Sequence, residues 1–454
     1  MSALDFGMKT SRLPDCVSSM ISISDEDSAL NFSRDQLEAI QLRRLKWSLQ
    51  HAYENVPMYR HKFDRFGVHP NDLQELEDLC YFPFTTKDDL RESYPFGMFA
   101  VPQDKLIRIH ASSGTTGRPT VAGYSAQDLV IWAKLVARCL RLAGAEPGDI
   151  IQNAYGYGLF TGGLGLHAGI EEAGCVAVPI SGGQTEKQIQ LLQDFQPRGI
   201  CCTPSYLLVI LDAMKANGID PKSTNLCYAI LGAEPWTDAM RDEIEQGFGI
   251  VAVDIYGLSE LMGPGIASES AIYRNGATVW EDHFLPEIIS MDDRHVPLIE
   301  GSRGELVFTS LTKQAMPLIR YRTKDISSLE AGDAFPAYRK MRKVDGRTDD
   351  MINLRGVNIF PSHIEEIALA IPDLTGHFVL EISRPSRLDC LKVLIEKRPG
   401  CNDGDADLAA NRLRHDIKAR IGSSVAVEVL PFGALPRSDG KSVRVHDRRV
   451  GKVI

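Results

Sequence analysis

The sequence predicts an α/β protein with a large N-terminal domain, in which helices cover parallel-rich sheets, and a small α+β domain at the C-terminus. Between residues 127 and 255, short β-rich apolar runs alternate with amphipathic segments, an order typical of largely parallel sheet covered on both faces. After residue 300 the pattern changes to antiparallel-looking strands and then to a charged stretch at 342–350. A domain boundary is therefore expected near the charged stretch.

The first helix is expected to begin near Ser33. Ser33 and Gln36 have the spacing of a capping box, and apolar residues then recur at helical spacing until Pro57 marks the end. Further helices are expected at 127–142, from 185, from 205 and after 236. Strands are expected at 150–154, 175–180, 199–202, 227–231, 251–255 and 304–311.

The C-terminal part of the chain mixes both kinds of element. The expected order is a helix at 362–370, strands at 377–382 and 391–395, a helix at 407–421 and a last strand. Three parts of the chain are thus predicted: a loose N-terminal extension (1–30), a large domain (31–348) and a small domain (349–454).

The composition is that of an ordinary globular protein, with 454 residues, 44% of them apolar, and a formal net charge of -10. This negative charge argues against nucleic acid as a partner. The nine cysteines lack metal-type spacing, which favours free thiols in a reducing cytoplasm. No window approaches the ~20 apolar residues of a membrane span, so we expect a cytoplasmic protein without a membrane partner.

A loop rich in glycine and small hydroxyl residues follows residue 111. Several backbone N–H groups and hydroxyls lie close together in such a loop, as the wrapping of polyphosphate oxygens requires. The loop is not a Walker A motif, because Pro119 follows Arg118 and blocks the helical N–H pattern. A polar surface turn is the alternative interpretation. The candidate phosphate-binding residues are Ser112, Ser113, Gly114, Thr115, Thr116 and Gly117.

A second candidate site follows the strand at 251–255, at the carboxyl end where open α/β sheets bind ligands. It contains Tyr256, Gly257, Ser259 and Glu260. Ser259 has a hydroxyl suited to a phosphate, and Glu260 has the oxygen atoms that Mg²⁺ prefers as ligands. The alternative is a helix N-cap followed by an acid in the first turn.

Two shorter segments are weaker candidates. Gly232, Ala233, Glu234 and Pro235 end another predicted strand, in a form suited either to close approach of a flat ligand or to a plain turn. Tyr155 and Phe160 lie among glycines and would either line an aromatic pocket or belong to the core.

Two patterns point away from ligand binding. Residues 163–168 match a dinucleotide fingerprint, but they do not form the first strand-to-helix turn, and no acidic residue follows at the right distance. Glu281, Asp282 and His283 have no cysteine or second histidine at ligand spacing, so a surface hydrogen-bonded cluster is expected there. We predict no zinc site.

The loops and their order resemble the adenylate-forming superfamily, and over nearly the whole chain they look specifically like phenylacetate-CoA ligases. The segments that carry the resemblance are 109–117, 154–163, 181–188, 233–237, 280–284 and 319–323. The resemblance implies an acid–thiol ligase of phenylacetate catabolism that uses ATP, Mg²⁺ and coenzyme A and forms an acyl-adenylate. It also implies a mobile small domain that rotates between the two steps.

The resemblance assigns the nucleotide site first. It gives the ATP phosphates to the 112–120 loop, the adenine face to residues 232–235, and phosphate and Mg²⁺ to Ser259 and Glu260. Tyr256 and Gly257 are further nucleotide-binding residues. Asp325 matches the acid that holds the ribose hydroxyls, and Arg347 matches the arginine that assists it.

The remaining roles concern the acid and the second domain. Tyr155 and Phe160 match the aryl-acid pocket, and Asp349 falls on the hinge between the domains. Lys441 matches the catalytic lysine that the small domain carries.

Two rival functions stay open at this stage. One is a ligase for another aryl acid, such as an aminobenzoate or a hydroxyphenylacetate, which loads a carrier-protein thiol. The other is a non-catalytic ligand-binding protein on the same scaffold, although Glu260, Asp325 and Lys441 argue against it. The preferred acid is not fixed by one pocket, and a homodimer is the default expectation.

Overall fold

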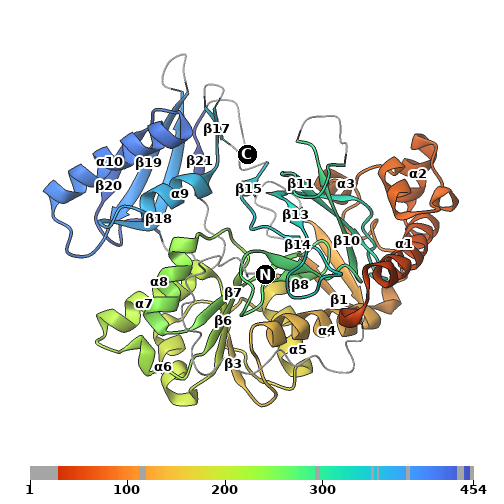
Figure 1. Ribbon diagram of the computed structural model, residues 1–454, viewed down its shortest axis with the longest axis horizontal. Helices are drawn as coiled ribbons and strands as arrows, with labels where there is room; N and C mark the ends of the chain where they lie inside the picture. The colour runs from red at the N-terminus through yellow and green to blue at the C-terminus, as the bar shows by residue number, and fades with distance from the viewer. Residues whose placement is uncertain are drawn as a thin grey trace, which may run out of the picture.

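A large domain and a smaller one, drawn in blue, lie side by side in the computed structural model of the chain (Figure 1). The structure describes residues 29–111, 119–291, 297–348, 352–354, 357–384, 389–436 and 444–449. Its elements confirm the predicted α/β architecture with a smaller α+β part at the C-terminus.

The large domain contains a nine-stranded sheet with the order β13-β14-β9-β8-β7-β6-β5-β3-β4. The parallel half consists of β3 (Ile150–Asn153), β4 (Val176–Val178), β5 (Gly199–Cys202), β6 (Tyr228–Gly232) and β7 (Val251–Leu258). The antiparallel half consists of β8 (Gly263–Ser268), β9 (Ala277–Val279), β13 (Leu329–Glu330) and β14 (Lys340–Met341). All five predicted strands of the alternating region are therefore present, and the antiparallel extension was not predicted.

Helices cover both faces of this sheet, because neighbouring residues of a strand point to opposite faces. Cys201 and Ile230 pack in one core, which includes residues of α4 (Ala126–Leu142) and α5 (Thr161–Glu172). Cys202 and Leu231 pack in a second core, with α6 (Thr185–Phe195), α7 (Pro204–Ala216) and α8 (Asp238–Phe248). Figure 1 shows α6, α7 and α8 to the left of the parallel strands and α4 and α5 to the right.

A second, four-stranded sheet has the order β10-β11-β12-β15 and is antiparallel throughout. Its strands are β10 (Phe284–Ile289), β11 (Gly304–Ser310), β12 (Tyr321–Ser327) and β15 (Gly346–Arg347). A separate antiparallel pair, β1 (Leu106–Ala111) and β2 (Val121–Ser125), lies on either side of the predicted phosphate loop in the chain. Strands β11 and β12, after residue 300, are antiparallel as expected, but the change to antiparallel pairing begins earlier, at β8.

Among the residues that the structure describes, three α-helices precede these sheets: α1 (Arg34–Asn55), α2 (Pro57–Phe66) and α3 (Lys87–Glu92). The predicted capping box is present, since the Ser33 hydroxyl accepts from the Gln36 N–H and the Gln36 side chain accepts from the Ser33 N–H. Pro57 occupies the first position of α2, where its missing N–H costs nothing, and the chain therefore breaks between the two helices.

The C-terminal part has its own apolar core, centred on residues such as Ile364, Leu380, Val393 and Leu413. Its four-stranded sheet has the order β20-β19-β18-β21. The elements are β16 (Ile352–Leu354), β17 (Val357–Ile359), α9 (Pro361–Leu369), β18 (Leu374–Ser383), β19 (Cys390–Lys397), α10 (Asp403–Ile421), β20 (Ala426–Leu430) and β21 (Val445–Asp447).

The cluster at 281–283 lies in the interior, so the expectation of a surface cluster is wrong. Glu281 and Asp282 are at most 1% exposed. Arg34 Nη1 lies 2.5 Å from Glu281 Oε2, and Arg138 Nη1 donates to both oxygens of Asp282 at 3.0 Å. Local spacing could not show this burial, because the paired arginines come from α1 and α4.

The glycine-rich match at 163–168 lies in α5, where the glycines allow close helix packing. A Cβ atom on Gly165 would lie 2.2 Å from the Trp132 ring, and one on Gly169 would lie 2.2 Å from Val136 Cγ1. Trp132 and Val136 belong to α4. The pattern therefore serves the contact between α4 and α5 and is not a dinucleotide turn.

Candidate active site

Two predicted residues from distant parts of the chain, Tyr256 and Arg347, contact a third predicted residue, Asp325. The Tyr256 hydroxyl, at the end of β7, donates to Asp325 Oδ2 at 2.6 Å. Arg347 Nη1, on β15, donates to Asp325 Oδ1 at 2.8 Å. Burial, followed by the neighbouring Asp325 carboxylate, raises the pKa of Tyr256 well above its usual value, so the hydroxyl keeps its proton and donates.

Glu260 lies in the turn between β7 and β8, which replaces the helix start considered as an alternative. The side chain is buried, and its Oε1 accepts from Thr120 Oγ1 at 3.2 Å. The neighbouring Ser259 Oγ lies 2.9 Å from Thr161 Oγ1, at the start of α5. Thr120 belongs to the end of the predicted phosphate loop, so loop and turn adjoin.

The base of the phosphate loop is fixed by strand pairing. Ala111 and Val121 are partners in the antiparallel ladder of β1 and β2, and Ala111 N–H also donates to the Leu159 carbonyl. The predicted loop residues Ser112, Ser113, Gly114, Thr115, Thr116 and Gly117 lie outside the described residues, as do Asp349 and Lys441.

Lys87 is a site residue that the sequence analysis missed. Its Nζ lies 3.7 Å from Glu260 Oε1, and it occupies the first position of α3 after the capping residue Thr86. A lysine after a helix cap carries no signal that separates it from a solvated surface lysine. Only the fold brings this charge to Glu260, across 173 positions of the chain.

The 232–235 segment forms a tight connection at the end of β6. A Cβ atom on Gly232 would lie 2.2 Å from the Ile255 carbonyl oxygen of β7, so only glycine fits there. Ala233 has a φ of 71°, in the left-handed region. Glu234 Oε1 accepts from the Ser205 N–H at 2.8 Å, and burial raises the pKa of Glu234.

Tyr155 and Phe160 differ in their surroundings. Tyr155 is buried, its hydroxyl has no hydrogen-bond partner among the described residues, and burial raises its pKa well above the usual value. Phe160 is 51% exposed and precedes α5. Tyr155 therefore lies in the interior, whereas Phe160 is accessible from solvent.

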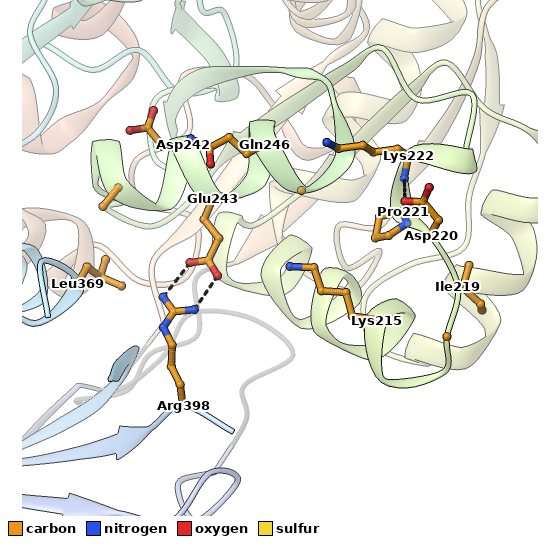
Figure 2. Close-up of a pocket in the computed structure, with 13 residues that line it drawn as sticks. Lys215, Ile219, Asp220, Pro221, Lys222, Asp242, Glu243, Gln246, Leu369 and Arg398 are labelled. Carbon is orange, nitrogen blue, oxygen red and sulfur yellow. Dashed lines mark hydrogen bonds and ion pairs between the residues drawn. The ribbon is translucent and has the colours of Figure 1, made fainter. Parts of the chain in front are cut away.

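One cavity is separate from these residues. It has a volume of about 900 Å³ and lies where α7 and α8 meet the small domain (Figure 2). At its edge Arg398 and Glu243 form an ion pair across the two domains, with Nη1–Oε1 at 3.1 Å and Nη2–Oε2 at 3.4 Å. None of the predicted site residues lines it.

The described ranges contain no group of three or more His, Cys, Asp or Glu residues placed to hold a metal ion. None of the helices in that part of the chain has both the length and the hydropathy that a membrane span requires.

Known proteins match both parts of the chain. Residues 35–312 match the family described as AMP-binding enzyme, and residues 356–449 match the AMP-binding enzyme C-terminal domain. A phenylacetate-coenzyme A ligase of Aromatoleum evansii is 55% identical over 422 residues, covering 92% of this chain and 96% of that protein.

Two solved structures of one protein, 2-hydroxyisobutyryl-CoA ligase, indicate how the domains are arranged. The postadenylation state with 2-HIB-AMP gives a TM-score of 0.86 at 27% identity, covering 91% of this chain and 90% of that one. The thioesterification state with 2-HIB-AMP and CoA gives 0.69 at 26% identity, covering 96% of each. The described arrangement therefore resembles the postadenylation state more closely.

Proposed function

The chain belongs to the AMP-binding enzyme family, and on that basis we propose which residues carry out its ATP-dependent ligation of phenylacetate to coenzyme A. The reaction is that of an acid–thiol ligase. A carboxylate oxygen of phenylacetate attacks the α-phosphorus of ATP and pyrophosphate leaves. The CoA thiol then attacks the acyl carbon of phenylacetyl-adenylate, and AMP leaves.

The observation that carries the function is the 55% identity with a phenylacetate-coenzyme A ligase over 92% of this chain. A protein that loads a carrier domain, or one without catalysis, is not favoured beside this likeness. The convergence of Tyr256 and Arg347 on Asp325 supports a nucleotide site in particular.

In the proposed site Asp325 binds the ribose hydroxyls. Its carboxylate is buried and already oriented by Tyr256 and Arg347, so little ordering is left for ATP to induce. The segment 232–235 lies against the adenine, and Tyr155 with Phe160 forms the walls for the aryl acid.

The residues at Glu260 fit a magnesium ion. A buried carboxylate supported by the Thr120 hydroxyl is a hard oxygen ligand, the kind that Mg²⁺ shares with nucleotide phosphates. When bound, the ion would neutralise charge on the phosphate oxygens during attack at the α-phosphorus. Ser259 and the 112–117 loop would hold the phosphates, and Lys441 would stabilise the charge that develops in the first step.

The arrangement of the two domains supports a rotation about Asp349 between the steps. The likeness to a postadenylation state suggests that this structure corresponds to the first step, with the thiol step requiring another orientation. We further propose a cytoplasmic location, in agreement with the free thiols of the described cysteines, and a homodimer as the default assembly.

A pyrophosphate-release screen tests the function. The acids are phenylacetate, hydroxyphenylacetates, benzoate, aminobenzoates, indoleacetate and short fatty acids, each with and without CoA. Phenylacetate is expected to give the highest kcat/KM, because the pocket walls are apolar rings. A preference above about tenfold for an aminobenzoate or a fatty acid would contradict the assignment, since one pocket contact changes discrimination by ~10- to 200-fold.

A further inference from the structure

A buried lysine, Lys313, contacts Tyr124, a residue next to the proposed ATP site. Lys313 follows β11, is 0% exposed, and its Nζ has no hydrogen-bond partner in the described part of the chain. The Nζ lies 3.5 Å from the centroid of the Tyr124 ring. An ammonium over an aromatic face is a cation–π contact, which is strongest where water is excluded.

Tyr124 connects this lysine to the two parts of the phosphate site. It belongs to β2, the strand that follows the predicted phosphate loop in the chain. Its hydroxyl donates to the Met262 carbonyl at 3.0 Å and lies 3.4 Å from the Ser259 carbonyl. These carbonyls flank Glu260, so Tyr124 ties the turn that carries Glu260 to the strand that ends the loop.

The groups that face Lys313 come from three elements. Asp128 on α4 is the nearby carboxylate, but its oxygens accept from the Gln314, Ala315 and Ser125 N–H groups at 2.7 to 2.9 Å. His110 on β1 and Tyr124 on β2 complete the surroundings. Burial lowers the pKa of Lys313 to about 7, with Asp128 opposing the shift.

We propose that Lys313 is a positioning residue for ATP, which acts through Tyr124 to hold the Glu260 turn against β2, the strand that follows the phosphate loop in the chain. The inference rests on the ATP site proposed above. If Lys313 served only for packing, its replacement by methionine would leave the KM for ATP unchanged. Replacing a buried charge with an apolar side chain of similar size is often neutral or stabilising for the fold.

The ammonium makes the positioning sensitive to pH. Below the folded pKa of about 7 the side chain is charged and the cation–π contact is present, whereas above it the neutral amine loses that contact. The KM for ATP is therefore expected to rise several-fold as the pH passes through this value.

The test compares Lys313→Met, Tyr124→Phe and the double variant in pyrophosphate release from about pH 6 to about pH 9. Met has a similar length without the charge, and Phe keeps the ring while removing the hydroxyl. Lys313→Met is expected to raise the KM for ATP about fivefold at the acid end, with kcat within about twofold and the inflection near neutral pH lost. The double variant is expected to be no worse than the poorer single variant, because both changes break one chain of contacts.

Lys340→Met is the matched control. Lys340 is also buried, but it lies on β14 and pairs with Asp333 at 2.7 Å. This variant should keep the wild-type pH profile of the KM for ATP. ATP itself titrates in the same way in the assays of all variants, so its titration does not affect the comparison of their pH profiles.

The inference is overturned if Lys313→Met keeps the wild-type KM and pH profile, or if the effects of Lys313→Met and Tyr124→Phe add. If Lys313→Met does not fold, as judged by circular dichroism, Tyr124→Leu takes its place, because this change removes the aromatic ring. A wild-type KM for ATP and a wild-type pH profile in Tyr124→Leu would then overturn the inference. A wild-type protein that releases no pyrophosphate with ATP and phenylacetate contradicts the proposed function instead, so the two failures are distinguishable.

Discussion

Arg347 and Asp325 face each other in the ladder between β15 and β12, with Nη1 2.8 Å from Oδ1. Tyr256 reaches the other oxygen of the same carboxylate from the neighbouring sheet. Side chains from two other strands, β7 and β15, thus hold the Asp325 carboxylate in a fixed orientation, with both of its oxygens engaged before any nucleotide binds.

We predict that Asp325→Asn raises the KM for ATP by about 10- to 100-fold, since a hydrogen bond to a charged group contributes ~1.5 to 3 kcal/mol. The kcat should change little, because ribose contacts are equal in the ground and transition states. The variant should also lose most of the preference for ATP over 2′-deoxy-ATP and 3′-deoxy-ATP. Tyr256→Phe, which removes one donor to Asp325, should show a smaller change in the same direction, and unchanged discrimination in Asp325→Asn would contradict the ribose role.

We predict that Glu260→Gln raises the Mg²⁺ concentration needed for half-maximal activity by at least roughly tenfold, because a charged oxygen ligand becomes a neutral amide. The measurement is pyrophosphate release against Mg²⁺ concentration, with folding checked by circular dichroism. Thr120→Val, which removes the hydroxyl that donates to Glu260, should show a weaker form of the same shift. An unaltered Mg²⁺ requirement in Glu260→Gln would rule out the metal role.

We predict that Lys441→Ala lowers the rate of pyrophosphate release by ~100- to 1000-fold, as removal of a donor to a developing charge does elsewhere. Capture of chemically supplied phenylacetyl-adenylate by CoA should stay within severalfold of the wild type, because the lysine acts in the first step. Lys418→Ala, at an exposed lysine of α10 in the same domain, is the control and should change neither step. If both half-reactions fall together, or neither does, the role of Lys441 and the domain rotation are both wrong.

The ion pair between Arg398 and Glu243 is expected to stabilise the domain arrangement seen here. Both side chains are partly exposed, so the pair contributes at most ~1 kcal/mol, or about fivefold in the balance between arrangements. Glu243→Gln should therefore slow adenylation by up to about fivefold while leaving thioester formation from supplied adenylate unchanged or faster. The matched control is Asp403→Asn, which breaks a pair with Lys397 inside the small domain. Equal effects of the two variants would argue against a role of the interdomain pair.

His283 is expected to make the protein sensitive to acid. Burial lowers its pKa from 6.5 to about 4, so the folded state takes up its proton only at lower pH than the unfolded state does. The contribution of His283 to the free energy of unfolding is fully present above pH 6.5 and is lost as the pH falls toward 4. The total loss for this side chain is roughly 3 kcal/mol.

Unfolding by urea at several pH values tests this expectation. His283→Gln should lose less stability than the wild type between neutral pH and about pH 4, whereas His61→Gln, at an exposed histidine of α2, should follow the wild type. Parallel curves for His283→Gln and wild type would show that the histidine does not titrate in this range.

The sequence alone determined the fold class and the order of the elements. Period-two and helical patterns are local, so the strand at 199–202 and the capping box at Ser33 were predicted at the positions where they occur. The likeness to a known family came from segments such as 109–117 and 319–323, whose order along the chain is also a property of the sequence.

Only the tertiary structure decided which charged side chains meet and which are buried. Lys87 lies beside Glu260, Lys313 lies over Tyr124, and the acids at 281–283 are interior because strands and helices from distant parts of the chain pack there. The pKa of a side chain depends on its surroundings, and these consist mostly of residues far away in sequence. Local sequence patterns therefore determine the helices and strands of this protein, whereas the electrostatics of its site arise from packing between residues far apart in sequence.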